Sequence, residues 1–377
     1  MPCTLSILLI HTLLSLLLPL TLAQTWTSCN PLNGTCPADT ALSTNHTFDF
    51  TLAQPGNTWN LTAGAISYSP TTGAAFTINQ KGDSPTIQSK FYLFFGVVEV
   101  WMQAATGKGI VSSIVLQSDD LDEIDWEIIG SNTTHVENNY YGKGNTTDAV
   151  ARAKWYPMPG ANSTDNNNSS ASSSSPQDGF HNYTTSWTQE KLEWYVDGSL
   201  IRTLKYEDAN GGASYPQTPC QLRLGIWPAG DPSNNNYTVA WAGGEVDYKK
   251  GPYTMNVKSA RVTDFSSGKE YQYGDRTGSW QSIKTIPGNS TSQETLSKPP
   301  EKSLKQQFEG LSKGGKIGVA VGVIGAAVLA LAGLWACCAI QRRKGRKEAA
   351  LADAAYERDT AELLEYRAQG PKGWEKI

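Results

Sequence analysis

Four carboxylates occur within the ten-residue stretch LDEIDWEIIG at positions 121–130, although only 18% of the chain is charged. Successive side chains of a β-strand point to opposite faces, so the apolar residues here share one face and the acidic residues share the other. We expect the apolar face to enter the core and the acidic face to line a solvent-filled site. The acidic face holds Glu123, Asp125 and Glu127, and the apolar face holds Ile124, Trp126 and Ile128.

The spacing of Glu123 and Glu127 fits two carboxyl groups that act on a glycosidic bond. Residues i and i+4 of a strand lie about 13 Å apart at roughly 3.3 Å per residue. Side chains that lean toward each other bring the carboxyl groups to roughly 5 to 7 Å, a range that includes the roughly 5 to 5.5 Å of retaining glycosidases and reaches the lower limit of inverting ones. Curvature of the sheet favours the shorter value.

Three neighbouring carboxylates repel one another, so at least one is expected to have a raised pKa, as a general acid requires. The alternative is a calcium site or a solvated acidic edge strand. Calcium ligands usually come from loops with Asp/Asn/Gly spacing, and an edge strand is not normally flanked by apolar segments such as IVLQ and IIG. The pattern therefore favours catalysis over a metal site.

The elements that must position these carboxylates are expected to be strands. The region between Gln24 and about Pro287 is rich in Gly, Thr, Ser, Tyr and Trp, and turn residues separate its short apolar runs. We predict a single all-β sandwich with a hairpin turn at Asp197-Gly198. Strands are predicted within 91–105, 109–118, 123–130, 191–206 and 220–227.

Both ends of the chain predict an exported, membrane-attached protein. An apolar run followed by small residues indicates a cleaved signal peptide. A later 24-residue run without a charged side chain is longer than the about 20 apolar residues that cross a bilayer. Basic residues from Arg342 to Lys347 follow it and predict a type I membrane protein whose large N-terminal domain lies outside the cell. The predicted segments are a signal peptide at 1–23, a domain at 24–287, a stalk at 288–316, a transmembrane helix at 317–340 and a cytoplasmic tail at 341–377.

Three further segments have distinctive composition. The Asn/Ser-rich run at 161–179 cannot build a core and is predicted to be a disordered insertion in the domain. Gly318 and Gly322 form one GxxxG motif, which predicts a weak homodimer, although small residues are common in single spans. The tail segment 348–368 is rich in Ala, Glu, Leu and Arg and is either a helix or a plain solvated tail.

The cysteines and glycosylation motifs agree with an oxidising compartment. Cys29 and Cys36 are close in sequence and flank a Pro/Asn/Gly turn, so we predict a disulfide between them. Cys220 is then expected to be a buried thiol. Asn-X-Ser/Thr motifs recur along the exported part, as at Asn45, Asn182 and Asn236. A formal net charge of −4 without a basic patch outside the juxtamembrane run argues against nucleic acid as a partner.

The stretch DEIDWE resembles the E-x-D-x-E signature of glycoside hydrolase family 16. Further segments that resemble the fungal Crh group of this family are NNYYGKG, FHNYTTSWTQEKLEWYVDG, LGIWPAGDPSN and WAGG. The resemblance covers about residues 25–265. It implies a concanavalin-like jelly-roll of two curved antiparallel sheets, and a cell-wall transglycosylase that joins chitin to β-glucan.

The resemblance also implies roles for individual residues. Glu123 would be the nucleophile, Glu127 the proton donor and Asp125 the residue that orients Glu123. In double displacement, one carboxylate attacks the anomeric carbon while the other protonates the leaving oxygen and later activates the incoming hydroxyl. This chemistry needs only the two carboxyl groups, so no cofactor and no metal are expected.

The segment CQLRLGIW is expected to supply part of a sugar site. Arg223, Gly225 and Trp227 fall on one strand face and offer a hydrogen-bonding group, a gap and a flat ring. By resemblance, Arg223, Trp227 and Thr238, together with Glu127, would bind the chitin donor. Trp126 is expected in the core. Trp241, Tyr140 and Tyr141 fit either the core or the cleft, and of these Trp241 is counted among the substrate-binding candidates. His181 is expected to be structural.

Two other functions compete with transglycosylation of chitin onto β-glucan or chitin acceptors. An endo-hydrolase of chitin or β-glucan would use the same carboxylates. A wall-binding sensor would grip polysaccharide without catalysis and signal through the tail, but a broken triad would be expected of it, whereas Glu123 and Glu127 are both present.

Overall fold

The computed structural model describes residues 26–52, 56–147, 152–159, 175–298, 308 and 310–368. It divides into two compact units, at 1–299 and 300–377. The predicted signal peptide at 1–23 lies outside the described residues, as does most of the predicted insertion at 161–179. The fold and the candidate site described below belong to the first unit.

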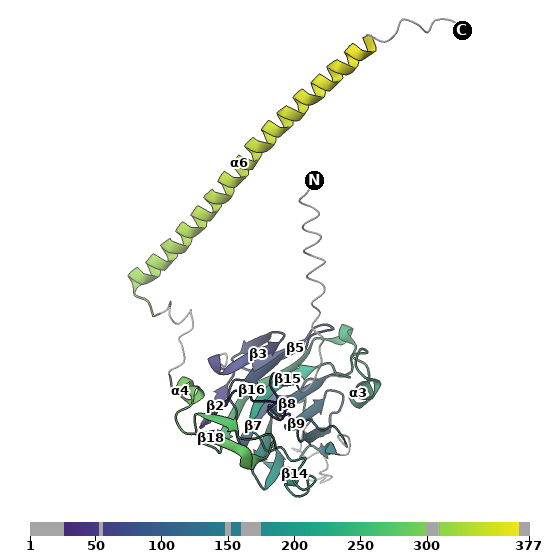
Figure 1. Ribbon diagram of the computed structural model, residues 1–377, viewed down its shortest axis with the longest axis vertical. Coiled ribbons are helices and arrows are strands. Elements are labelled where there is room, and N and C mark those ends of the chain that lie inside the picture. The colour runs from purple at the N-terminus through teal and green to yellow at the C-terminus, as the bar shows by residue number, and fades with distance from the viewer. Residues whose placement is uncertain are drawn as a thin grey trace, which may run out of the picture. The chain divides into compact units, whose positions relative to one another are not determined.

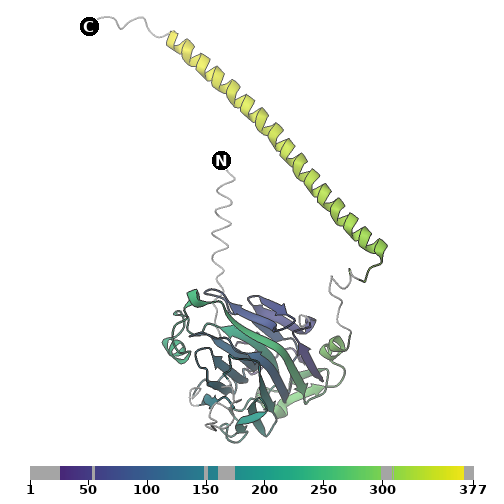
Figure 2. The same cartoon turned by 180° about the vertical axis from the view of Figure 1, so that it is seen from behind.

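Two large antiparallel sheets form this unit, as the sequence predicts (Figures 1 and 2). One sheet has the strand order β11-β10-β9-β8-β15-β6-β3, and the other has the order β14-β13-β12-β7-β16-β5-β4, with β2 also paired to β16. A small sheet, β1-β17-β18, joins strands from near the two ends of the unit. The fold is therefore an all-β sandwich.

The first sheet contains β3 (Trp59–Ala63), β6 (Thr86–Ser89), β8 (Val111–Ser118), β9 (Glu123–Ile129), β10 (His135–Tyr141), β11 (Lys154–Pro157) and β15 (Cys220–Trp227). The second contains β2 (Asn45–Asp49), β4 (Ile66–Ser69), β5 (Gly73–Ile78), β7 (Gly96–Gln103), β12 (His181–Trp187), β13 (Lys191–Val196), β14 (Ser199–Lys205) and β16 (Tyr253–Asp264). The small sheet contains β1 (Asp39–Thr40), β17 (Glu270–Tyr273) and β18 (Ile283–Ile286). The short helices are η1 (Gly56–Thr58), α3 (Asn236–Trp241), η2 (Tyr248–Lys250), η3 (Trp280–Ser282) and α4 (Thr291–Ser297).

The core lies between the two large sheets and receives the apolar face of β9. Ile124, Trp126 and Ile128 are each at most 1% exposed. The Trp126 indole N–H donates a hydrogen bond of 3.0 Å to Thr185 Oγ1 on β12, in the opposite sheet. This bond satisfies the one polar group of a large buried ring. The predicted core role of Trp126 is confirmed, and the acidic face of β9 must point away from the core.

The β13–β14 hairpin turns at Asp197-Gly198, as predicted. Both residues have positive φ, at 49° and 78°, which a two-residue turn of this hand requires and which glycine adopts without steric cost. His181 Nδ1 lies 2.7 Å from Asp197 Oδ2, and its Nε2 lies 3.1 Å from the Ser175 carbonyl oxygen. The histidine therefore ties this turn to a neighbouring segment, which is the structural role expected of it.

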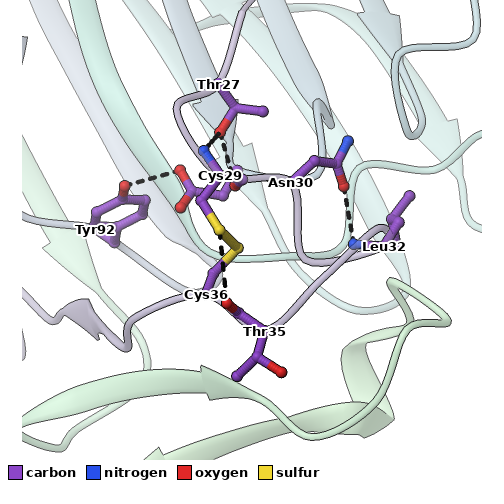
Figure 3. The surroundings of a disulfide bond; sticks show 8 residues. Thr27, Cys29, Asn30, Leu32, Thr35, Cys36 and Tyr92 are labelled. Atoms are coloured by element: carbon purple, nitrogen blue, oxygen red, sulfur yellow. Dashed lines mark hydrogen bonds between the residues drawn. A yellow bond between two sulfur atoms is a disulfide. The ribbon is translucent and has the colours of Figure 1, made fainter.

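The predicted disulfide between Cys29 and Cys36 is present, with the two Cα atoms 5.8 Å apart (Figure 3). Next to it, the Asn30 side chain accepts a hydrogen bond of 2.9 Å from the backbone N–H of Leu32 and closes the turn between the cysteines. Cys220 is a free, fully buried thiol, as expected.

The first compact unit extends beyond the predicted domain boundary at 287. Ser290 caps α4 by accepting a hydrogen bond of 2.9 Å from Gln293 N, and Ser290 is completely buried. Its hydroxyl also donates to the Leu42 carbonyl oxygen at 3.4 Å. The beginning of the predicted stalk at 288–316 is therefore packed on the domain, because its capping serine finds partners there.

The second unit contains one long helix, α6 (Lys313–Ala368), and residues 348–368 of the predicted tail are helical. Within the described residues, none of the helices combines the length and apolar character needed to cross a membrane, so the predicted span at 317–340 is not confirmed. Gly318 and Gly322 both lie in α6, and the homodimer through them stays a prediction.

Candidate active site

A cavity of about 880 Å³ lies over the seven-stranded sheet, on the face opposite the core. Strands β8, β9, β10 and β15 supply its floor, and α3 supplies part of its wall. The predicted site residues all line it, namely Glu123, Asp125, Glu127, Arg223, Trp227, Thr238 and Trp241. Chain segments more than a hundred residues apart thus meet in one cleft.

Strand register arranges the polar residues of the floor in rows that cross the sheet. Glu127 lies opposite Ser113 on β8 and opposite Glu137 on β10. In the next row, Asp125 lies opposite Val115 on β8 and Asn139 on β10. Directly paired residues of antiparallel strands point to the same face, so each catalytic candidate has its neighbours determined by pairing.

Asp125 shares a side-chain hydrogen bond with Glu123. Burial and the nearby carboxylates hold the pKa of Asp125 well above its usual range, so Asp125 keeps its proton. Burial also raises the pKa of Glu123, to about 7, but the Asp125 hydrogen bond and the Arg223 charge act in the opposite direction. Asp125 is 4% exposed, and its Oδ1 is buried without a hydrogen-bond partner, which fits a neutral acid better than an anion. The pair therefore places the negative charge on Glu123.

Glu127 has a different environment from Glu123. Burial is the main cause that raises its pKa to about 8, and the charges of Glu137 and Glu123 add to the effect. Its Oε2 accepts hydrogen bonds from Ser113 Oγ at 3.0 Å and from the Trp227 indole N–H at 3.4 Å. Since both bonds reach Oε2, the other oxygen is left to carry a proton. When the surroundings of two carboxyl groups give them different pKa values, the group with the higher pKa is assigned as the acid and the other as the nucleophile.

Asp122, the fourth carboxylate of the opening stretch, has a structural role. It is completely buried just before β9, and it accepts backbone N–H bonds from Lys143 at 2.8 Å and Gln217 at 2.7 Å. A further bond of 2.9 Å comes from Thr218 Oγ1. These contacts join three loops next to the first residue of β9. They therefore determine where Glu123 enters the cavity.

The predicted sugar-binding residues form two different parts of the cleft. Arg223 lies on β15, and its charge acts on Glu123. Trp227, at the end of the same strand, stacks on Trp241 of α3 with ring centroids 5.9 Å apart and an interplanar angle of 27°. Thr238 reaches the cavity from α3. Trp241 therefore lies in the wall of the cleft.

The adjacent tyrosines Tyr140 and Tyr141 lie on opposite faces of the sheet. Tyr141 lines the cavity opposite Glu123, whereas Tyr140 is only 5% exposed and belongs to the core.

Sequence reasoning missed several polar residues of the floor, among them Glu137 and Ser113. Glu137 is 3% exposed and accepts a hydrogen bond of 2.7 Å from the Trp241 indole N–H. Ser113 donates to Glu127. The alternation of Glu137, Asn139 and Tyr141 within HVENNYY could have indicated a second polar strand face, but their pairing with the acidic face of β9 depends on strand register.

Among the described residues, no group of three or more His, Cys, Asp or Glu side chains is arranged to hold a metal ion. On the acidic face of β9, Glu127 accepts from a hydroxyl and an indole group, and Glu123 pairs with Asp125.

The family model for glycosyl hydrolases family 16 matches residues 54–243. Crh-like protein 2 of Botryotinia fuckeliana is 54% identical over 339 residues, which cover 89% of this chain and 71% of that protein. Crh-like protein 3 of Aspergillus fumigatus is 50% identical and covers 92% of this chain and 90% of its own length. The solved Crh5 transglycosylase in complex with NAG is 49% identical and has a TM-score of 0.63, over 68% of this chain and 100% of that one.

Proposed function

Because the chain belongs to glycosyl hydrolase family 16 and matches Crh-like proteins over most of its length, we propose that it is a cell-wall transglycosylase. It cleaves chitin and transfers the new end to a β-glucan or chitin acceptor, which crosslinks the fungal wall. The observation that carries this proposal is the placement of Glu123 and Glu127 on one strand face, in one cavity, with different environments.

In the first half of the reaction, Glu123 attacks the anomeric carbon of the donor sugar. Asp125 supports this step because its hydrogen bond keeps the charge on Glu123. Glu127 donates its proton to the leaving glycosidic oxygen at the same time. The glycosyl group is then attached covalently to Glu123, and Glu127 is an anion.

In the second half, Glu127 acts as the base. It takes the proton of an incoming hydroxyl, whose oxygen bonds to the anomeric carbon and releases Glu123. Inversion occurs twice, so the configuration of the sugar is retained. A sugar hydroxyl as the acceptor gives a crosslink, whereas water gives hydrolysis by the same residues.

The aromatic and cationic residues of the cleft suit a sugar chain. Trp227 presents a ring beside Glu127, where a pyranose ring can stack, and Arg223 supplies hydrogen-bond donors on the same strand. Thr238 adds a hydroxyl from α3. We propose that these residues bind the chitin donor and that Trp241 supports Trp227.

The proposed site of action is the outer face of the plasma membrane, where the wall polymers lie. Export is supported by the Cys29–Cys36 disulfide, which forms in oxidising compartments. The uncharged run at 317–340, followed by Arg342 and Arg343, carries the proposal of a membrane anchor.

Deletion of 317–340 tests this anchor. It should move the protein from the membrane pellet to the soluble fraction, and a full chain that is already found in the soluble fraction would refute the anchor.

A transfer assay tests the activity. The full chain is given a chitin oligosaccharide donor and a fluorescent β-1,3-glucan or chitin oligosaccharide acceptor, next to the variants Glu123→Gln and Glu127→Gln. We expect larger labelled products from the wild type and none from either variant.

Two other outcomes would contradict transglycosylation. Shortened donor without labelled product would assign the protein as an endo-hydrolase. Unchanged sugars together with retained binding would favour the polysaccharide sensor.

Glu99→Gln is the matched control. Glu99 lies on β7 in the other sheet, where its carboxylate pairs with Arg261 at 3.2 Å, so this variant is expected to leave transfer unchanged.

A further inference from the structure

Glu137 is a buried carboxylate of the cleft that the double-displacement chemistry does not use. It lies on β10 directly opposite Glu127 of β9 and is 3% exposed. Its Oε2 accepts the indole N–H of Trp241 at 2.7 Å, although the two residues are 104 positions apart in sequence. A buried acid with such a short contact to one ring holds that ring in place.

The ring that Glu137 holds is half of a stacked pair. Trp241 packs on Trp227, and the Trp227 indole N–H donates to Ser113 Oγ at 3.1 Å and to Glu127 Oε2 at 3.4 Å. Both rings rest on a small apolar cluster, separate from the main core, made of Val111, Ile129, Ala229 and Ala242. Two paired carboxylates, Glu127 and Glu137, therefore each accept from one ring of the same stack.

This arrangement connects the position of Trp241 to that of Glu127. If Trp241 loses its partner on β10, Trp227 loses the ring against which it packs, and the weaker of its two hydrogen bonds is the one to Glu127. Glu127 then keeps only the Ser113 donor on Oε2. The two carboxyl oxygens of Glu127 then differ less in their hydrogen bonding, so the proton is held less firmly on the oxygen that carries it.

We propose that Glu137 is a positioning residue: by holding Trp241 against Trp227, it keeps Glu127 oriented for proton transfer. The role in proton transfer rests on the proposed function. The contact between Glu137 and Trp241 can be tested without any sugar, so failure of the proposed function and failure of the positioning role can be told apart.

Charge supports the same assignment. Burial raises the pKa of Glu137 to about 7, and the Trp241 hydrogen bond opposes the rise. Glu137 in turn contributes to the raised pKa of Glu127. Two other carboxyl groups interact electrostatically with Glu127 or Glu137, namely Glu123 and Asp125 of β9. The charged and titratable groups next to these two are Tyr141 of β10 and Arg223 of β15.

The first experiment observes the contact. The full chain, labelled with 5-fluorotryptophan, gives one fluorine signal for each of its twelve tryptophans, and Trp241→Phe identifies the signal of Trp241. We expect this signal to shift with pH around the pKa of Glu137, about 7, and to lose that shift in Glu137→Gln. A Trp241 signal that titrates equally in both proteins would overturn the proposal.

The second experiment measures transfer kinetics for Glu137→Gln and Glu137→Ala. The amide oxygen of glutamine can still accept from Trp241, so we expect kcat within about threefold of wild type and an alkaline limb moved to lower pH. Alanine removes the acceptor, and a misplaced reacting group can cost up to about a hundredfold in rate, so we expect a loss of at least about tenfold. Equal kinetics for all three proteins would refute the positioning role, as would equal losses in both variants.

Thermal unfolding of the same variants checks folding, and Glu99→Gln again serves as the control. If the wild type transfers no sugar at all, the proposed function is wrong, while the fluorine titration still decides whether Glu137 holds Trp241.

Discussion

Asp125 and Glu123 lie two positions apart on one strand and share a hydrogen bond in which the buried aspartic acid keeps the proton. Glu123 remains the anion of the pair, which a nucleophile must be. We therefore expect Asp125→Asn to retain a hydrogen-bond donor and a folded protein, yet to lower kcat by about tenfold to a hundredfold through poorer alignment. Asp125→Ala should be worse than Asp125→Asn, and the kinetics of the transfer assay would check the order. Full activity of Asp125→Ala would contradict the orienting role.

The pH dependence of transfer should follow from the opposed requirements of the two glutamates. Glu123 must be ionised, so activity is lost as the pH falls through its pKa, about 7. Glu127 must be protonated, so activity is lost as the pH rises through its pKa, about 8. A bell-shaped profile of kcat/KM for the free enzyme is expected, and it is measured with the fluorescent acceptor. An acidic limb that survives unchanged in a Glu123 variant with residual activity would argue against the assignment.

Stability should decrease as the pH rises because the buried acids of the cleft are harder to ionise in the folded protein. The pKa of Glu127 is about 8 when folded, against the ordinary 4.5. Its contribution is fully present below about 4.5 and is lost as the pH rises through 8. Each pKa unit corresponds to about 1.4 kcal/mol, so the loss is on the order of a few kcal/mol. Thermal unfolding at pH 5 and pH 8.5 should differ less for Glu127→Gln than for the wild type, and an equal difference would contradict this reasoning.

Trp126 should matter for stability rather than for chemistry. Trp126→Phe removes the hydrogen bond to Thr185 and leaves part of the ring volume empty. The expected loss is on the order of 1–3 kcal/mol of unfolding free energy, with activity per folded molecule retained. Trp101→Phe is the matched control because Trp101 is 44% exposed on β7. Denaturant unfolding of both variants provides the measurement, and an equal loss in the two would argue against the core role.

The disulfide near the N-terminus offers a similar test. Cys29 and Cys36 close a short loop, and the entropy of the unfolded chain predicts a loss of about 2–3 kcal/mol when that link is removed. Cys29→Ser should lower Tm under oxidising conditions, whereas a reducing agent should have no further effect on this variant. A Tm equal to that of the wild type would show that the link does not stabilise the folded domain.

The sequence alone was sufficient to predict the strand class, the two faces of β9 and the residues that we propose as catalytic. Alternation of apolar and acidic side chains has a period of two, so the chain around Trp126 could be assigned a core face and a cleft face without knowledge of its neighbours. The Asp197-Gly198 turn and the Cys29–Cys36 link are equally local, and the structure confirms both.

Only the tertiary structure decided which residues surround the carboxylates. Pairing of β10 with β9 sets Glu137 opposite Glu127, and α3 brings Trp241 to Glu137 from 104 positions away. Strand register and helix placement depend on the packing of the whole sandwich, which leaves no local pattern in the sequence. For the same reason the sequence did not indicate that residues after 287 pack on the first unit, since Ser290 becomes buried only when α4 packs on the domain.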